Sequence, residues 1–422
     1  NPWINYNVLQ ALMLIEKDPE RVRQGVWKLM KSTDFFFSMY HEDGACDEGP
    51  TYWSGASGYA LKFLDLLAKV TENKVNIFNA PLLRNMAQYI YRVHIGGNYF
   101  VNFADSAPKV SPSPGILYRY GELTGDPAMM KFASFMAQQN QSFKDGVNGY
   151  FASALDELFM YKDIVGHPQG EPLTGTYWFK DTQICVARDT EGKSDGFFFA
   201  AKGGNNQESH NHNDVGSCIL YYNALPVLID AGVGTYTRQT FGPERYTIWT
   251  MQSDYHNLPL INGTPQKNGR EFAAHSQQYK ATAKTVSYQV DIARAYPQEA
   301  NVKSWIRNYT LHRKKDFTIT DKWKLSACNE PSVLNLMTCC EVEIDRNKNI
   351  TLTGEAGRFR VEYDKKLLSP ATDTVELTDP KLIHSWNRKK LTRIRFTIVS
   401  QQISGESKLV IRKAQYHKTL ND

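Results

Sequence analysis

Residues 196–232 read GFFFAAKGGNNQESHNHNDVGSCILYYNALPVLIDAG, a polar segment enclosed by two apolar runs. The runs before residue 203 and after residue 214 have the composition of buried β-strands. Residues 203–214 between them concentrate amides, an acid, an aspartate and the pair His210 and His212. Polar side chains crowded between two buried strands point to a functional segment on a β domain.

The β pattern continues from about residue 170 to the end of the chain. Alternating or β-branched and aromatic runs are separated by turn sequences such as DRNKN and SGES, and helical periodicity is absent. We therefore predict a large antiparallel β-sandwich domain over residues 166–422. The Gly- and Pro-rich stretch GHPQGEPLTG at 166–175 is the expected linker.

The first part of the chain has the opposite pattern. Apolar residues recur at three- and four-residue spacing over residues 7–15, 21–40, 59–70, 81–93, 115–125 and 128–140. Loops with Gly, Asp and Pro join these segments in pairs, which is typical of an α/α toroid or a stacked helical array. The predicted fold class is α+β and multidomain, with a helical domain over residues 1–165.

Composition narrows the function classes. A length of 422 residues favours two domains, and a net charge of +5 permits an anionic substrate. We expect no nucleic-acid partner because Lys and Arg form no dense run. We expect no membrane span because no apolar stretch reaches about 18 residues. The 23 Tyr and 8 Trp suit either a carbohydrate-handling surface or large cores. The chain begins NPWINYN without Met or a signal peptide, so we expect a mature or truncated product.

The two histidines are candidate metal ligands. On an extended segment residues i and i+2 share a face, so both rings could point the same way, or one could turn inward at a kink. Asp230 closes the run ALPVLID, and His256 follows in SDYHNLPLING. Two histidines and an aspartate from neighbouring strands can hold zinc with the fourth position open. A hydrogen-bonded His/Asp network without metal is the alternative.

A second candidate segment is HEDGACDEGPTYWSGA, residues 41–56. Asp43 begins a turn, Glu48 precedes a helix break, and Tyr52 stands at the start of the next helix. A tyrosine at a helix start facing a cleft can act as an acid or base. The alternative is a tyrosine packed on the surface.

Two further segments carry polar residues. Asn102 and Asp105 lie in the apolar loop YFVNFADSAPK, where capping or loop closure is the expected role. Arg238, Arg245 and Tyr246 lie within residues 237–257 and would suit a carboxylate or sulfate, because Arg forks match oxyanions. Ordinary surface charge is the competing interpretation.

Taken together, the pieces DGACDEGPTYW, NFAD, SHNHNDVGS, LPVLIDAGVGTY and HNLPLINGTPQ resemble the heparinase II/III-like polysaccharide lyases. The resemblance implies an α/α toroid followed by an antiparallel β-sandwich domain. It also implies cleavage of uronic-acid polysaccharides by β-elimination. The helices before residue 165 are too few for a full toroid, so we expect the family fold without its N-terminal helices.

The resemblance also implies roles for individual residues. The implied catalytic residues are Tyr52, His210 and Tyr246, with Tyr236 competing with Tyr246. The implied ligands of a structural zinc are His212, Asp230 and His256. We predict Asn211, Arg245 and Glu48 as substrate-binding residues. The family's carboxylate-binding Asn would fall at Asn1, at Asn5 or before residue 1.

The predicted function is therefore a lyase acting on an anionic, uronate-containing polysaccharide, heparan- or glycosaminoglycan-like first and alginate next. One alternative is a glycoside hydrolase using Asp43 and Glu48, because hydrolases need two carboxyl groups at a defined separation. Another is a non-catalytic glycan-binding protein. We expect a periplasmic or secreted bacterial location because polymers are cut outside the cytoplasm. The oligomeric state stays open.

Overall fold

The computed structural model describes residues 1–141 and 151–414, and the chain divides into two compact units. The helical unit comprises Asn1–Phe100 and Lys109–Leu173, and the β unit comprises Val101–Pro108 and Thr174–Asp422. The short segment 101–108 falls in the predicted helical domain but folds with the β unit. The physical reason is hydrogen bonding: Asn102, for example, donates from Nδ2 to the carbonyl of Asp230 at 3.0 Å.

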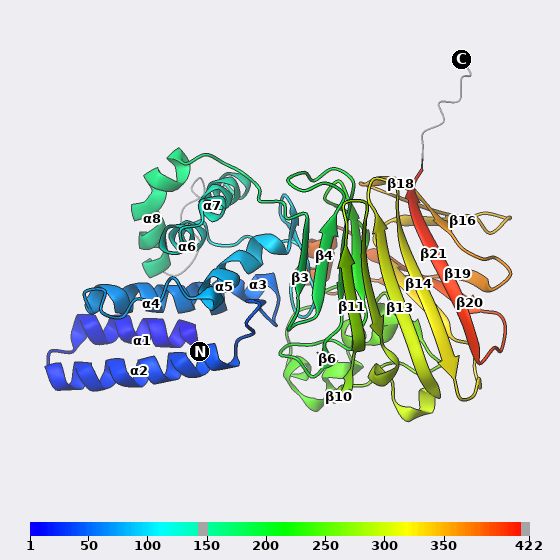
Figure 1. The fold of residues 1–422 in the computed structure, drawn as a ribbon, viewed down its shortest axis with the longest axis horizontal. Helices are drawn as coiled ribbons and strands as arrows, with labels where there is room; N and C mark the ends of the chain where they lie inside the picture. Colours follow the sequence, from blue (N-terminus) through cyan, green and yellow to red (C-terminus); the bar gives the residue numbers. More distant parts are fainter. Residues whose placement is uncertain (142–150, 415–422) are drawn as a thin grey trace, which may run out of the picture. The chain divides into compact units, whose positions relative to one another are not determined.

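The helical unit contains the six helices predicted from their apolar spacing and two further helices, over Pro50–Trp53 and Phe151–Gly166. They are α1 (Pro2–Ile15), α2 (Pro19–Met39), α3 (Pro50–Trp53), α4 (Tyr59–Val70), α5 (Pro81–Arg92), α6 (Pro114–Thr124), α7 (Pro127–Gln139) and α8 (Phe151–Gly166). Proline stands at the start of several of them, where its missing N–H costs nothing. Helix α1 packs against α2 and α4, and α6 against α7 (Figure 1). A short hairpin, β1 (His94–Gly96) and β2 (Tyr99–Phe100), precedes the segment that joins the β unit.

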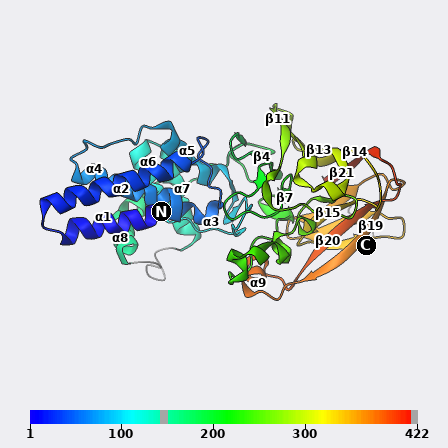
Figure 2. The same ribbon diagram turned by 90° about the horizontal axis from the view of Figure 1, so that it is seen from below.

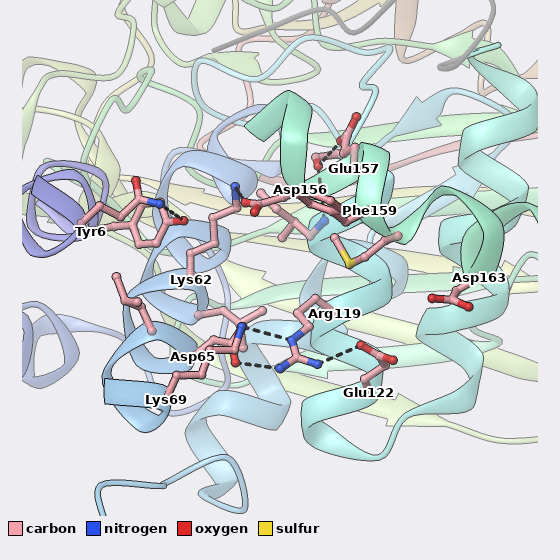
Figure 3. A pocket seen from close by; sticks show the side chains of 17 residues that line it. Tyr6, Lys62, Asp65, Lys69, Arg119, Glu122, Asp156, Glu157, Phe159 and Asp163 are labelled. Carbon is pink, nitrogen blue, oxygen red and sulfur yellow. Dashed lines mark hydrogen bonds and ion pairs between the residues drawn. The ribbon is translucent and has the colours of Figure 1, made fainter. Parts of the chain in front are cut away.

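A cavity of about 550 Å³ lies among α1, α4, α6 and α8 within the helical unit (Figure 3). Its charged side chains pair with one another. Arg119 donates to both oxygens of Asp65 at 2.8 and 3.1 Å, and Lys69 reaches the same carboxylate at 2.9 Å. Lys62 contacts Asp156 at 2.9 Å. Two of these pairs connect neighbouring helices, Arg119–Asp65 between α6 and α4 and Lys62–Asp156 between α4 and α8, which gives the cavity wall a structural role.

The β unit consists of antiparallel sheets (Figures 1 and 2). The five-stranded sheet has the order β3 (Thr176–Phe179), β4 (Ile184–Arg188), β5 (Phe197–Lys202), β7 (Cys218–Tyr222), β8 (Leu225–Leu228). The eight-stranded sheet has the order β11 (His275–Ala281), β12 (Thr285–Asp291), β13 (Val302–His312), β14 (Asp316–Leu325), β21 (Ser404–Lys413), β18 (Gly357–Glu362), β17 (Ile350–Gly354), β16 (Glu341–Ile344). The four-stranded sheet has the order β19 (Leu368–Glu376), β20 (Lys390–Ile398), β15 (Val333–Thr338), β9 (Pro259–Leu260), and β6 (Asn205–Asn206) pairs with β10 (Gly269–Ala273).

One apolar core joins the inner faces of these sheets. Phe199 of β5 meets Phe317 of β14 with ring centroids 5.1 Å apart, so the five- and eight-stranded sheets pack face to face. Leu336 of β15 belongs to the same core, which brings in the four-stranded sheet. On another face of that sheet, α9 (Pro380–Trp386) packs through Trp386. This arrangement confirms the predicted fold class, helices followed by an antiparallel β-sandwich.

The pairing of β5, β7 and β8 positions the polar segment. Ala201 at the end of β5 pairs with Cys218 at the start of β7, and Leu220 of β7 pairs with Leu228 at the end of β8. The loop over residues 203–217 and the residues that follow β8 therefore emerge at the same end of the sheet. This places His210, His212 and Asp230 near one another although they span twenty residues of sequence.

Candidate active site and metal cluster

The loop over residues 203–217 is fixed from inside by a buried ion pair. Lys202, at the end of β5, contacts Asp214 at 2.8 Å and Glu208 at 3.3 Å. Burial opposes the charged ammonium, but the two carboxylates outweigh it and raise the pKa of Lys202. Gln266 adds a second support, because its amide bonds both the N–H and the carbonyl of Val215. The loop is therefore held in a defined conformation by buried side-chain contacts.

A backbone kink separates the two histidines. His210 has φ of +55°, a left-handed conformation that is uncommon for a residue with a side chain. As a result the His210 side chain remains 25% exposed, whereas the His212 side chain is fully buried. Of the two arrangements that the sequence allows, the kinked one is present, with one ring outward and one inward.

The inward ring belongs to a compact cluster. His212, Asp230 and His256 are all buried, and one ligand atom from each lies within 4.8 Å of the others. Burial opposes the charged forms, yet mutual attraction raises the pKa of His256 and lowers the pKa of Asp230. Nδ1 of His256 and Oδ2 of Asp230 lie at an ion-pair distance of 3.0 Å, but their geometry does not satisfy either atom as a hydrogen bond would.

The unsatisfied atoms in this cluster fit a metal ion. Nδ1 of His212, Oδ2 of Asp230 and both ring nitrogens of His256 are buried without hydrogen-bond partners. Buried polar groups normally have partners, so several converging orphans indicate a ligand that satisfies them. Two imidazoles and one carboxylate are the donor set of a three-residue zinc site. The three residues therefore fit the zinc that the sequence analysis predicts.

The carboxylate of Asp105 organises the rest of the site. Oδ2 accepts from Nδ1 of His210 at 2.7 Å and from the hydroxyl of Tyr236 at 2.8 Å. Oδ1 accepts from Nε2 of His212 at 3.1 Å and from Nη2 of Arg245 at 2.8 Å. Burial opposes its ionisation, but the histidine hydrogen bonds and the nearby cations hold the pKa of Asp105 far below its usual range. The local sequence predicts capping or loop closure for Asp105, whereas its hydrogen bonds hold four side chains of the β unit.

Ionised Asp105 dictates both histidine tautomers. A carboxylate only accepts hydrogen bonds, so Nδ1 of His210 and Nε2 of His212 must carry the protons. Nδ1 of neutral His212 is then a lone pair, and it is the nitrogen that joins the cluster with Asp230 and His256. Nε2 of neutral His210 is likewise a lone pair, on the side of the ring away from Asp105. One ring is prepared to bind a metal and the other to accept a proton.

The two tyrosines of this region contact different residues. Tyr236 lies next to His210, with its hydroxyl 3.4 Å from Nδ1, whereas Tyr246 donates to Oδ1 of Asn211 at 2.7 Å. The Asn211 side chain also donates to the His212 carbonyl, and Arg245 donates to the Asn211 carbonyl. The described contacts of Asn211 and Arg245 thus stabilise the loop, and their predicted binding of substrate stays a prediction.

Two neighbours of Tyr236, Phe241 and Lys381, are not among the residues predicted from the sequence. Phe241 is 67% exposed, and its ring lies edge-on to the rings of Tyr236 and His210 at centroid distances of 5.0 and 6.4 Å. Nζ of Lys381, at the start of α9, lies 5.1 Å from the centroid of the Tyr236 ring. Asp379, which caps α9, also accepts from the N–H of Thr235 at 2.7 Å. The capping sequence of α9 was visible in the chain, but its position beside Tyr236 depends on tertiary folding.

The remaining predicted residues lie in the helical unit. Tyr52 is half-buried in α3, which is followed by a π-helical turn over Ser54–Gly58, a feature frequent at functional sites. Asp43 is buried and accepts from the N–H of Ala45 at 3.0 Å, as a turn-forming residue does. Glu48 is half-buried in the turn before α3.

The two asparagines at the start of the chain have structural contacts. Asn1 caps α1 by accepting from the N–H of Trp3 at 3.1 Å. Asn5 donates to Ser32 and Thr33 of α2, both at 3.0 Å. Their use as ligands of a substrate carboxylate gains no support from these contacts.

Comparison with known proteins agrees with this architecture. The family model described as "Heparinase II/III-like, C-terminal" matches residues 177–412. A mutant of the heparan sulfate lyase HepC from Pedobacter heparinus superposes with a TM-score of 0.70 at 13% identity, covering 98% of this chain and 60% of that one. A structure of heparinase III gives 0.69 at 16% identity, covering 97% and 60%. This chain therefore spans about 60% of the length of these solved structures, and at such identities they show the fold.

A search of curated proteins finds no match. Within residues 1–141 and 151–414, no helix has both the length and the apolar character needed to cross a membrane.

Proposed function

Because this chain belongs to the heparinase II/III-like family, we propose that it is a polysaccharide lyase that cleaves a uronic-acid-containing polysaccharide by β-elimination. The observation that carries the proposal is the pair of His210 and Asp105. A partly exposed imidazole is held through Nδ1 by a buried carboxylate, so its Nε2 is prepared to accept a proton.

Elimination begins with removal of the proton on C5 of a uronate. That proton is weakly acidic while the neighbouring carboxylate is charged, so the enzyme must supply a base and must also stabilise the charge of an enolate-like transition state. We assign the base to Nε2 of His210. The hydroxyl of Tyr236 and the ammonium of Lys381 are the nearby polar groups suited to the developing charge.

An acid must then protonate the leaving oxygen on C4. Resemblance to the family gives this role to Tyr52 of the helical unit, and the role stays a prediction. Tyr246 is a weaker candidate, because burial is the main reason that its pKa is raised, and its hydroxyl is occupied by Asn211. In the β unit Tyr236 is therefore the stronger candidate for a second active-site tyrosine.

The substrate we favour is a heparan- or glycosaminoglycan-like chain, with alginate next. The solved structures with the same fold include a heparan sulfate lyase and heparinase III by name. Exposed Phe241 beside His210 suits packing on the apolar face of a sugar ring. The positive charge of Lys381 suits a carboxylate or sulfate. A periplasmic or secreted location would follow from the size of such a polymer.

We further propose that the cluster of His212, Asp230 and His256 holds zinc. When bound, the ion would supply structural cross-linking between the loop over residues 203–217, the end of β8 and the segment before β9. His212 would bind it through Nδ1, since Nε2 already donates to Asp105. In this assignment the ion takes no part in the proton transfers. They are carried out by side chains that lie on the other side of Asp105 from the ion, such as His210.

Ultraviolet absorbance tests the reaction directly, because elimination creates a C4–C5 double bond conjugated to the carboxylate and hydrolysis creates none. Heparan sulfate, chondroitin sulfate, hyaluronan and alginate would be supplied separately to the wild type and to His210→Ala, Tyr52→Phe and Tyr236→Phe variants. We expect a rise on one polymer that falls at least about 100-fold in His210→Ala.

His312→Ala is the matched control, because His312 also bonds an aspartate through Nδ1, Asp316 at 2.6 Å, in the hairpin between β13 and β14. It should retain activity. A flat trace on all four polymers, or a saturated product, would contradict the proposal.

A further inference from the structure

Asp105 is the only side chain among the described contacts that bonds both His210 and His212. It is 1% exposed, and its two oxygens together accept from four side chains of the β unit. A carboxylate has about four lone-pair positions, so this one is fully occupied. Such a residue has no capacity left for substrate, and it acts through the groups that it holds.

The four donors divide into two pairs. His210 and Tyr236 bond Oδ2 and form the partly exposed side of the site. His212 and Arg245 bond Oδ1, and His212 connects that side to the metal cluster. The two histidines therefore contact opposite oxygens of one rigid, planar group.

We propose that Asp105 is a positioning residue that couples the metal cluster to the proposed base, fixing the metal-binding tautomer of His212 and the proton-accepting tautomer of His210 at the same time. Partners of this kind orient metal-ligating histidines and raise their basicity. The inference rests on the proposed function for the role of His210 as a base. The two hydrogen-bond geometries on which it is built do not depend on that function.

Replacement by asparagine separates the two halves of the coupling. Arg245 can only donate, so the amide oxygen of Asp105→Asn must face Arg245 and His212. The amide NH₂ then faces His210 and Tyr236. Nδ1 of His210 must become an acceptor, and its proton moves to Nε2, the nitrogen that should accept from substrate. His212 keeps an acceptor for Nε2–H and with it the metal-binding tautomer.

Replacement by alanine removes both halves. His212 loses the partner of Nε2, so we expect zinc affinity to fall about 10- to 100-fold. In Asp105→Asn the fall should be less than about tenfold, because the amide oxygen still accepts from His212. Turnover should fall at least about 100-fold in Asp105→Asn with little change in KM, since the loss affects proton transfer.

The experiment measures zinc affinity by chelator competition and the tautomer of His210 by ¹⁵N NMR of histidine-labelled protein. His210→Gln identifies the signal. Wild type should show a proton on Nδ1 of His210, and Asp105→Asn a proton on Nε2. The matched control is Asp189→Asn, because Asp189 is also buried in the β unit but bonds the backbone N–H groups of Phe197 and Lys314. The control should leave both readouts unchanged.

Unchanged zinc affinity in Asp105→Ala, or an unchanged His210 tautomer in Asp105→Asn, overturns the proposal, as does failure of the wild type to bind zinc. If the variants show both changes but the wild type cleaves no uronate polymer, the proposed function is overturned and the coupling is supported. The two failures are therefore distinguishable.

Discussion

Replacing Lys202 by methionine should destabilise the β unit by about 3–5 kcal/mol, the range for breaking a buried ion pair by removing one partner. Lys202 is 2% exposed and Asp214 is fully buried, so solvent cannot replace the lost contact. The contacts at 2.8 Å to Asp214 and 3.3 Å to Glu208 are charge-assisted, each worth about 1.5–3 kcal/mol. Methionine retains an apolar stem like that of lysine, so the loss of stability in this variant measures the effect of removing the charge.

Hydrogen–deuterium exchange of peptides from β5 and β7 is the assay, since a chain with two units does not unfold in one transition. Lys280→Met is the matched control, because Lys280 is exposed on β11 of the same unit, and it should stay within about 0.5 kcal/mol of wild type. The double variant Lys202→Met/Asp214→Asn should lose less than the sum of the single changes, because it removes the buried charge left behind. A loss below about 1 kcal/mol in Lys202→Met would refute the reasoning.

Three further predictions concern other parts of the molecule. Chelation should lower the melting temperature of the wild type but not of His256→Ala, because zinc at 100 times its Kd adds about 2.7 kcal/mol only where it binds; equal shifts in both would contradict the assigned ligand. Burial raises the pKa of Asp65, but Arg119 and Lys69 outweigh it and lower the pKa overall. The stability that Asp65 contributes is therefore present above its unfolded pKa of about 4 and lost as pH falls through the lower folded value, so a deficit of about 1–2 kcal/mol in Asp65→Asn at pH 7, measured by hydrogen–deuterium exchange of peptides from α4, should shrink below about pH 4. Gly44→Ala should cost more than about 2 kcal/mol by hydrogen–deuterium exchange of peptides from α5, because φ is +78° and the new Cβ would lie 2.2 Å from the Asn85 carbonyl carbon; a neutral result would require that backbone to move.

Much of the fold was accessible from the sequence. Helical spacing located the main helices of the first unit, and alternation located most strands, because both patterns record which face of an element is buried. Helix α8 was missed although its apolar spacing was present, and α9 was missed because seven residues give too short a pattern. His212, Asp230 and His256 could be predicted as candidate metal ligands from the sequence, because polar side chains of these types are unusual next to apolar strands.

The centre of the site was not accessible in the same way. Asp105 lies 105 residues before His210 in a loop whose local pattern suggested only capping, and nothing local records a partner that far away. The sequence left two arrangements open, both histidine rings on one face or one ring turned inward at a kink. Left-handed backbone is uncommon at a residue with a side chain, so local propensity could not select the kinked arrangement. The choice between Tyr236 and Tyr246 also depended on packing, because only the folded structure shows that Tyr236 contacts Asp105 and His210 whereas Tyr246 contacts Asn211.

The placement of segment 101–108 in the β unit has a consequence for synthesis on the ribosome. Asp105 is translated 140 residues before Arg245, and its other partners come only slightly earlier. At roughly 5–20 residues per second, that interval lasts about 7–28 s. During it the helical unit can form on both sides of a carboxylate that has no partners yet. The nascent chain must keep this loop accessible, because Asp105 is translated before all four side chains that bond it, His210, His212, Tyr236 and Arg245.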